Sequence, residues 1–446
     1  MTSWISGANP EKMAVLEKLL AYIDGQTDWV EDLQRALTAV PALGPENGGD
    51  GEWGKARLLE SRLLALGARV LPWKAGENLE LRGDPPGLNL RFIEAPDERV
   101  SGGSRPNLAA RLTGKSRKTL WIIGHMDVVP AGAPDLWETP PFELHRSGDW
   151  IRGRGVEDNQ QAIASGLLVL ETLVRHKVSP DLSYGLLLAA DEETHSVYGL
   201  DYVLREAPGL IRPEDLVLVP DMGDPEGQGI EISEKSCLWA RVTVTGKQGH
   251  ASRPDQGVNS LAAASAAVLA VDRLHREFPR TDALFSPSCS TFVPTKKEAN
   301  VENINTLPGR DVFYVDCRIL PDLDPRAPLA RLEELVREAA GKYGCEALVE
   351  TVVFDAVSPP PTSMGSEVAL RLRRSLQKLR GIRGEAMGAS GQTVASFLRA
   401  RGIPAVCWAT LAGNAHQPNE KSSLSFTLAD ARVFLDMLFD YVPAGG

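Results

Sequence analysis

Four short apolar runs of the sequence each lead into residues whose side chains can bind a metal ion or transfer a proton. The runs are 120–124, 182–190, 216–220 and 403–411. The residues that follow them are His125 and Asp127, then Asp191, Glu192 and Glu193, then Asp221, and lastly His416. A single Asp or His after a strand is usually a solvated loop or capping residue. Four such arrangements in one chain favour a shared site instead.

A fifth candidate, Asp158, lies in the glycine-rich stretch 153–159, which leads into an amphipathic helical pattern. Its simplest role is to cap that helix, because aspartate is a preferred N-cap residue. The glycine spacing also invites a dinucleotide-binding fingerprint, but the third glycine is not in place, so we reject that interpretation. A serine-nucleophile elbow at 388–392 fails because Gln392 stands where the last glycine belongs.

The types of side chain in these segments indicate metal chemistry. Imidazole and carboxylate ligands without thiolates suit Zn²⁺ or a similar first-row divalent ion, and one carboxylate can bridge two ions. Two ions about 3.5–4 Å apart polarise a carbonyl and hold a hydroxide, as a hydrolase requires. The supply of ligands therefore predicts a metal-dependent hydrolase.

The elements that must position these residues are strands and helices in alternation. Continuous apolar strands between helical patterns are typical of a largely parallel sheet covered on both faces. In an open parallel sheet the carboxyl ends of the strands share one edge, where ligands bind. This fold would deliver the residues after the four apolar runs to one rim.

Between residues 236 and 353 the pattern changes to partly alternating strands. Expected strands at 239–244 and 312–319 flank expected helices at 258–275 and 325–343. The approximate β-α-β-β-α-β order is typical of a ferredoxin-like module. The stretch 355–364, with three consecutive prolines, is expected to be a linker. We therefore predict a discontinuous α/β domain, 1–235 and 354–446, interrupted by a smaller α+β domain, 236–353.

Composition narrows the class of protein. The 446 residues include 48 Lys+Arg and 59 Asp+Glu, a formal net charge of −11, which argues against nucleic acid as a partner. The sequence contains no apolar stretch long enough to span a membrane, and its first residues lack the pattern of a secretory signal. The five cysteines include no C-x-x-C pair, so we expect no disulfide framework and a cytoplasmic location.

With these motifs in order, the sequence resembles the M20 family of metallopeptidases and amidohydrolases, the group of acetylornithine deacetylase, succinyl-diaminopimelate desuccinylase, aminoacylase and carboxypeptidase G2. The matching motifs are Gly124-His125-Met126-Asp127, Gly155-Val156-Glu157-Asp158, Asp191-Glu192-Glu193, Pro220-Asp221-Met222 and Ala415-His416-Gln417-Pro418. The resemblance implies a zinc-exopeptidase-like domain with a mostly parallel sheet, interrupted by a ferredoxin-like lid and dimerisation domain.

The resemblance also implies a role for each matched residue. One zinc would be held by His125, Asp158 and Asp221, and the other by Asp158, Glu193 and His416. Two Zn²⁺ per chain are expected, with Co²⁺ or Mn²⁺ as alternatives. Asp127 would accept the remaining N–H of His125 and so orient its ring. Glu192 would be the general base, because a carboxylate that already binds zinc is too weak a base.

Three residues of the insertion match family residues of the lid. His250, in Gly246-Lys247-Gln248-Gly249-His250, would reach the site of a partner subunit and stabilise the oxyanion; read alone, it is an ordinary turn residue. Asn305 and Arg318 would contact substrate, Arg318 by anchoring an α-carboxylate. Solvated polarity of an edge strand is the alternative for both. We expect a homodimer paired through the insertion, because about 115 residues are too few to supply both a lid and an internal mimic of a partner subunit.

Several positions depart from the family pattern. Segment 388–393 lacks the usual aspartate, His195 stands where glycine is common, and Asn159 follows Asp158 without the common Asp-x-Lys-Gly pattern. The family also implies a cis peptide bond between Asp158 and Asn159. These departures leave the metal ligands intact but concern the specificity for the substrate side chain, so the choice between desuccinylase, deacetylase and dipeptidase stays open.

We therefore predict a two-zinc hydrolase that cleaves a peptide or N-acyl amide of a small substrate beside a carboxylate-bearing residue, through a metal-bridging hydroxide. The alternative is a non-catalytic, metal-stabilised binding or scaffold protein of the same fold. Glu192 distinguishes the two, since a scaffold has no use for an unligated carboxylate at that position.

Overall fold

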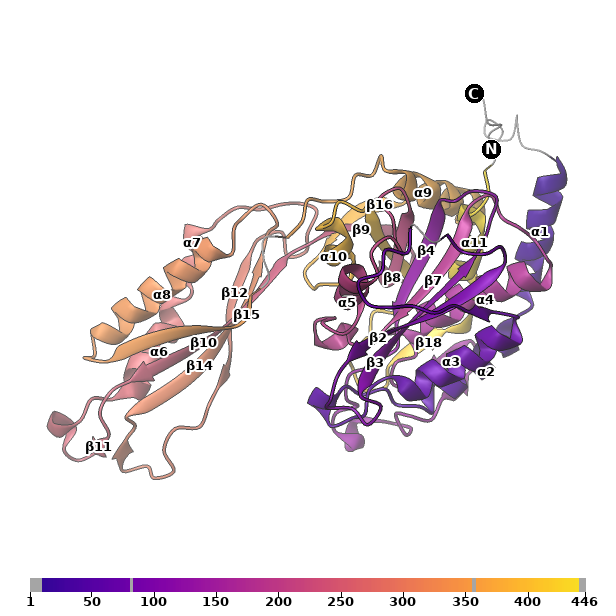
Figure 1. The fold of residues 1–446 in the computed structure, drawn as a ribbon. Helices are drawn as coiled ribbons and strands as arrows, with labels where there is room; N and C mark the ends of the chain where they lie inside the picture. Colours follow the sequence, from indigo (N-terminus) through magenta and orange to yellow (C-terminus); the bar gives the residue numbers. More distant parts are fainter. Residues whose placement is uncertain (1–9, 81–82, 355–357, 441–446) are drawn as a thin grey trace. The chain divides into compact units, whose positions relative to one another are not determined.

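The computed structural model describes residues 10–80, 83–354 and 358–440 (Figure 1). The chain divides into two compact units. The first comprises Met1–Ile232, Thr362–Ala386 and Thr393–Gly446, and the second comprises Ser233–Pro361 and Met387–Gln392. The predicted insertion, 236–353, falls inside the second unit, and all five predicted metal ligands fall inside the first.

The first unit is built on a nine-stranded sheet. In spatial order its strands are β1 (Arg69–Val70), β2 (Leu88–Pro96), β3 (Ser104–Leu112), β7 (Ser183–Ala189), β4 (Thr119–His125), β8 (Leu216–Asp224), β17 (Ala405–Thr410), β9 (Gly229–Glu234) and β16 (Glu385–Ala389). The four central strands β7, β4, β8 and β17 pair in parallel, whereas β2, β3 and β7 pair antiparallel. The predicted α/β fold with a mostly parallel central sheet is confirmed.

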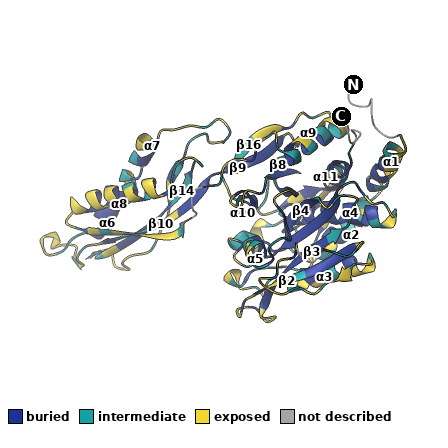
Figure 2. Cartoon of the chain, turned by 45° about the horizontal axis from the view of Figure 1, so that its top comes forward, coloured by how far each residue is buried: buried dark blue, intermediate teal, exposed yellow. Residues whose placement is uncertain are grey.

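Helices cover this sheet, and every residue of β4 and β7 is buried (Figure 2). The helices are α1 (Pro10–Asp24), α2 (Thr27–Thr38), α3 (Trp53–Ala65), α4 (Gln160–Arg175), α5 (Leu200–Glu206), α9 (Glu367–Arg380), α10 (Ala395–Arg399) and α11 (Leu424–Met437). Helix α4 packs on β4 and β7, and α11 packs on α4 and β17. Leu200 of α5 and Leu398 of α10 join a core cluster with Trp121 of β4. Continuous apolar strands are the sequence signature of such two-sided burial.

A small antiparallel sheet completes the first unit. It consists of β5 (His145–Ser147), β6 (Trp150–Arg152) and β18 (Lys421–Ser423). Within the described residues, no helix is long and apolar enough to cross a membrane.

The second unit is a four-stranded antiparallel sheet with helices. Its strands lie in the order β12 (Thr291–Lys297), β14 (Arg310–Ile319), β10 (Ser236–Thr245) and β15 (Glu346–Phe354), and its helices are α6 (Ser260–Ala270), α7 (Arg273–Glu277) and α8 (Arg326–Gly341). Along the chain the order is β-α-β-β-α-β, the ferredoxin-like pattern that the sequence predicts. Alternate residues of β10 and β14 face a core shared with α6 and α8. A two-stranded ribbon, β11 (Gly249–His250) with β13 (Thr306–Leu307), extends this unit.

Two details differ from the sequence expectations. The single helix expected at 258–275 is divided into α6 and α7, although Val271 and Asp272 between them keep right-handed helical angles. The strands predicted for the large sheet correspond to β4, β7, β8 and β17, whereas β1, β2 and β3 on one side and β9 and β16 on the other were not predicted. Of the expected linker, 355–357 lies outside the described residues.

Candidate metal centre

The predicted metal ligands come from five segments of the first unit. They are His125 at the end of β4, Asp158 before α4, Glu193 after β7, Asp221 in β8 and His416 after β17. Because β4, β7, β8 and β17 run parallel, their carboxyl ends share one edge of the sheet. The fold thus brings these side chains to the rim that the sequence analysis expects.

Asp158 lies between the two imidazoles. Nε2 of His125 is 2.8 Å from Oδ1 of Asp158 and 3.7 Å from Oδ1 of Asp221. Nε2 of His416 is 3.1 Å from Oδ2 of Asp158 and 3.0 Å from Oε2 of Glu193. Each oxygen of Asp158 therefore faces a different histidine, which is the arrangement that a carboxylate shared by two ions requires.

The donor atoms are close enough to surround a metal ion. Ligand atoms of His125, Asp158 and Glu193 all lie within 4.8 Å of one another, and so do those of His125, Glu192 and Asp221. Imidazole nitrogens and carboxylate oxygens are donors that Zn²⁺ accepts. Carboxylates held this close repel one another unless a cation lies among them. The residues therefore fit a divalent metal.

The charges of the site shift the pKa values of its groups. Hydrogen bonds with Asp158 and Glu193 raise the pKa of His416 to about 10. Burial, reinforced by the charge of Asp158, raises the pKa of Glu193 to about 7. Burial and the neighbouring charge of Asp221 raise the pKa of Glu192 well above its ordinary value. The centre thus holds more negative charge than its own residues compensate.

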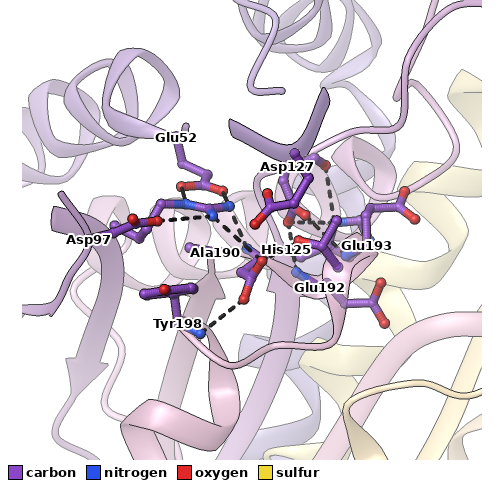
Figure 3. A network of polar contacts seen from close by, with 12 residues as sticks. Glu52, Asp97, His125, Asp127, Ala190, Glu192, Glu193 and Tyr198 are labelled. Atoms are coloured by element: carbon purple, nitrogen blue, oxygen red, sulfur yellow. Dashed lines mark hydrogen bonds and ion pairs between the residues drawn. The ribbon is translucent and has the colours of Figure 1, made fainter. Parts of the chain in front are cut away.

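Asp127 connects the first histidine to the turn that carries the two glutamates (Figure 3). Nδ1 of His125 is 3.1 Å from the backbone oxygen of Asp127 and 3.4 Å from its carboxylate. That carboxylate accepts hydrogen bonds from the backbone N–H groups of Glu192, at 3.1 Å, and Glu193, at 3.0 Å. Asp127 therefore orients the His125 ring, and it also holds the 192–193 turn.

A buried ion network lies behind this turn (Figure 3). Arg105 and Glu52 are both fully buried, and Nε of Arg105 donates to Glu52 at 2.7 Å. Nη1 of Arg105 is 3.5 Å from Asp191, whose backbone is left-handed with φ 60° and whose carboxylate accepts from the N–H of Tyr198. The network fixes the strained residue that precedes Glu192. The sequence analysis missed Arg105 and Glu52, which carry no motif.

Glu420 secures the loop that carries Asp158. Its side chain is fully buried, and Oε1 accepts from the backbone N–H groups of Glu157, at 2.9 Å, and Asp158, at 3.0 Å. Oε2 accepts from the N–H of Gly155 and from Nη1 of Arg154, at 3.0 and 2.6 Å. Because Glu420 lies four residues after His416, this contact joins the segments of two ligands.

Glu157 makes the reciprocal contact, from the loop of Asp158 to the loop of His416. Its buried carboxylate accepts from the backbone N–H groups of Ala412 and of Asn414, the latter at 2.8 Å, in the loop that leads to His416. Each of the two ligand loops thus supplies a glutamate that binds the backbone of the other. We call these reciprocal contacts of Glu157 and Glu420 with the backbone of the other loop the glutamate exchange.

Asn159 connects two of the ligand segments. Its amide donates to Oδ1 of Asp221 at 2.7 Å and to the backbone oxygen of Pro220, and its Oδ1 accepts from the N–H of His125. The peptide bond between Asp158 and Asn159 is cis, which confirms that prediction. Helix α4 begins at Gln160 with Asn159 at its N-cap position, so the capping role considered for Asp158 is wrong.

Lys55, in the first turn of α3, is a further residue that the sequence analysis missed. It is buried, and its Nζ has no hydrogen-bond partner among the described residues. Burial lowers the pKa of Lys55 to about 8, against the charges of Asp127 and Glu420, which raise it. Lys55 therefore places a positive charge near the carboxylates of the centre.

The three predicted lid residues belong to the second unit. His250 in β11 pairs with Thr306, and the N–H of Ala251 donates to the backbone oxygen of Asn305 at 2.8 Å, so Asn305 lies in the turn just before β13, close to His250. Nδ1 of His250 accepts from the N–H of Ser252 at 3.1 Å. In a neutral ring Nε2 then carries the proton and can donate a hydrogen bond.

Arg318 already has a carboxylate partner. Its Nε and Nη2 donate to the two oxygens of Asp316, at 2.9 and 3.1 Å, from the same face of β14. Both side chains are about one quarter exposed. A substrate carboxylate would have to share this guanidinium with Asp316.

One departure from the family pattern has a backbone explanation. His195 closes the turn after Glu193 with a left-handed φ of 81°, a conformation that favours glycine.

In segment 388–393, the N–H of Gly388 donates to the backbone oxygen of Leu284 and the hydroxyl of Ser390 donates to the backbone oxygen of Ser286. These contacts hold the segment without the usual aspartate.

Comparison with known proteins yields a family match. The model of peptidase family M20/M25/M40 matches residues 121–440. A metallohydrolase of Methanococcus maripaludis is 32% identical over 422 residues, covering 91% of this chain and 98% of the relative. A succinyl-diaminopimelate desuccinylase of Rhodospirillum rubrum is 27% identical over 425 residues, covering 92% and 98%.

Solved structures share the fold. A metallo-carboxypeptidase of the M20 family from Sulfolobus solfataricus superposes with a TM-score of 0.69 at 19% identity, covering 92% of this chain and 98% of that one.

The glutamate exchange predicts an effect on metal binding. In Glu420→Gln, the side chain keeps its shape but loses the charge that attracts three backbone N–H groups, so Asp158 should lose its fixed position. We expect zinc affinity to fall about 10–100-fold, as for other residues that orient metal ligands. Competition with a chromogenic chelator measures this affinity. Glu17→Gln, at an exposed site on α1, is the control; unchanged affinity in a folded Glu420→Gln protein would contradict the proposed positioning.

Proposed function

Because the chain belongs to peptidase family M20/M25/M40 and is a metal-dependent hydrolase, we propose that it holds two zinc ions and cleaves a peptide or N-acyl amide bond beside a carboxylate-bearing residue. The observation that carries this proposal is the position of Asp158, whose two oxygens face two different histidines. His125 and Asp221 would complete one site, and Glu193 and His416 the other.

When bound, the ions supply the positive charge that polarises a scissile carbonyl and activates a water molecule. Glu192 supplies the proton transfer. Its carboxylate lies beside His125 and Asp221, and the ligand set proposed for each ion is complete without it. Glu192 can therefore take a proton from the attacking water and pass it to the leaving amine.

Asp127 and the network behind it keep Glu192 in place. The N–H of Glu192 is fixed by the Asp127 carboxylate, and the preceding Asp191 is fixed by Arg105. Because the backbone of Glu192 is fixed, less reorganisation of the base is needed at the moment of proton transfer. This arrangement favours an enzyme over the alternative of a metal-stabilised scaffold.

The two adjacent glutamates provide a matched test. Glu192→Gln should lower kcat about 10²–10⁴-fold without loss of zinc, because it removes only the proton acceptor. Glu193→Gln should instead weaken zinc binding. The measurements are zinc content and turnover on a pooled set of dipeptides and N-acyl amino acids. Near-normal turnover in Glu192→Gln would exclude this residue as the base. Two zinc ions per chain without turnover of any substrate would favour the scaffold.

Recognition of substrate is proposed to involve Asn305 and Arg318. A guanidinium presents a planar fork suited to a carboxylate, and Arg318 has both prongs on Asp316. A substrate α-carboxylate would displace Asp316 from the guanidinium or share the guanidinium with it, while Asn305 helps to orient the substrate. The metallo-carboxypeptidase described above has the same fold, and its name is consistent with removal of a residue that bears a free carboxylate.

This recognition predicts a preference for free acids. We expect kcat/KM for an N-acyl amino acid to exceed that for its C-terminal amide by about tenfold or more, since the neutral amide gains no charge-assisted hydrogen bond from Arg318, which then stays with Asp316. Arg318→Ala should abolish most of this preference. Arg241→Ala, which removes an arginine from neighbouring strand β10, should retain it. Equal rates on acid and amide in the unaltered enzyme would contradict the anchor.

A homodimer paired through the second unit is proposed, with His250 acting on the partner's substrate. The N–H that Nε2 of His250 presents, once Nδ1 has accepted from Ser252, suits stabilisation of an oxyanion. Mixing inactive Glu192→Gln and His250→Ala chains tests this assignment. Partial recovery supports action across subunits, and no recovery after proven subunit exchange contradicts it.

A further inference from the structure

A cavity of about 310 Å³ lies in the first unit, away from the metal centre. Its wall includes the end of β3 and the residues that lead into β4. These segments lie next to the start of β7, where Leu112 pairs with Tyr184 and Thr119 pairs with Ser183. His125 is at the other end of β4. At about 3.3 Å per residue, that is roughly 20 Å from Thr119. The cavity is therefore separate from the residues proposed to act in catalysis.

Arginine side chains line this cavity together with the buried Leu79 and Leu210. Arg91, Arg111 and Arg212 line it, and their side chains are 6%, 17% and 10% exposed. Nη2 of Arg111 and of Arg212 both donate to the backbone oxygen of Arg117, so these two guanidiniums converge on one carbonyl. Burial, together with the like charges of Arg212 and Arg91, lowers the pKa of Arg111 against the opposing effect of Asp84.

The buried carboxylates do not balance these arginines. Asp84 is shared, with Oδ1 2.6 Å from Nη2 of Arg91 and Oδ2 3.6 Å from Nη1 of Arg111. Asp215 pairs with Arg212 at 2.9 Å and also accepts from the N–H of Thr119. Three buried guanidiniums therefore face two buried carboxylates.

Carboxylates at the rim do not cancel this surplus, because Glu80, which also lines the cavity, is exposed to water. Lys115 pairs with Asp181, and Arg212 also reaches Glu214, but Lys115 is 62% and Glu214 is 50% exposed. Such exposed pairs are screened by water and salt, so they compensate buried charge weakly. Nε of Arg91, moreover, has no hydrogen-bond partner among the described residues. Arg117, which is exposed, adds a further cation to the lining.

We propose that this cavity is a binding site for a small anion that carries a phosphate or carboxylate group, distinct from the substrate of the metal centre. Guanidinium groups bind both kinds of oxyanion through paired N–H donors. One added negative charge would balance the three buried arginines, and the volume is that of a small-molecule site. Nε of Arg111 donates to Thr119 and its Nη2 donates to Ser183, so Nη1, which is 3.6 Å from Asp84, is the donor of Arg111 that such a ligand would contact.

The probes are inorganic phosphate and succinate, titrated separately into the zinc-loaded full chain by calorimetry. We expect saturable binding of at least one anion at one site per chain. Tighter binding of phosphate would identify a phosphate-bearing ligand, and tighter binding of succinate a carboxylate. Arg111→Gln should weaken binding at least tenfold, and Arg117→Gln, at an exposed position where folding is not at risk, at least threefold.

Arg35→Gln, which changes an exposed arginine of α2 that does not line the cavity, is the matched control and should bind as the unaltered chain does. Thermal melting without anion establishes that each variant is folded. The proposal is overturned if neither anion binds, or if Arg111→Gln and Arg117→Gln both bind with unchanged affinity. Unchanged binding in both would place the anion at the metal centre instead. Peptidase activity of the variants is measured separately, so failure here leaves the catalytic proposal unaffected.

Discussion

The mutual repulsion of carboxylates around Asp158 is the constraint on which the rest of the first unit depends. Acidic side chains from several segments meet at one edge of the sheet, where Asp158, Glu193 and Asp221 are mostly buried and their charges interact strongly. The carboxylates that are not proposed metal ligands accept hydrogen bonds from donors of the protein instead. Backbone N–H groups serve Asp127, Glu157 and Glu420, and Arg154 adds a charged donor to Glu420.

The contacts of the non-ligand glutamates determine the conformations of the two loops that carry Asp158 and His416. The glutamate exchange forces the segment before α4 and the segment after β17 to run side by side, because each glutamate needs the backbone of the other loop. Gly155 adopts φ 87° within this contact, and an added Cβ would lie 2.6 Å from Val128. The loops are thus fixed by contacts of the protein itself, and the oxygens of Asp158 remain directed at the two histidines.

Much of this architecture could be predicted from the sequence. Apolar runs predict buried parallel strands, and the topology then places the residues after them at one edge, as observed for His125 and Glu193. The family resemblance added the pairing of ligands and the cis bond at Asp158, which no periodicity contains. Strand β9 escaped prediction because its charged Glu231 is buried through an ion pair with Arg399, 168 residues away.

The residues that hold the ligands were also beyond prediction. Arg105 lies 53 residues from Glu52, and Glu157 lies 257 residues from Asn414. A single sequence contains no signal for such pairs, because each residue alone looks like a solvated charge. Only the fold shows that they are buried and joined.

The shared role of Asp158 is tested most directly by titrating zinc into the metal-depleted unaltered chain and into two variants, His416→Ala and Asp158→Asn, and measuring the bound zinc. The unaltered chain should bind two ions, and His416→Ala should bind one. Asp158→Asn should weaken both sites, because one carboxylate is proposed to serve both ions. If Asp158→Asn bound two ions as tightly as the unaltered chain, or lost only one of them, the central place given to Asp158 would be contradicted.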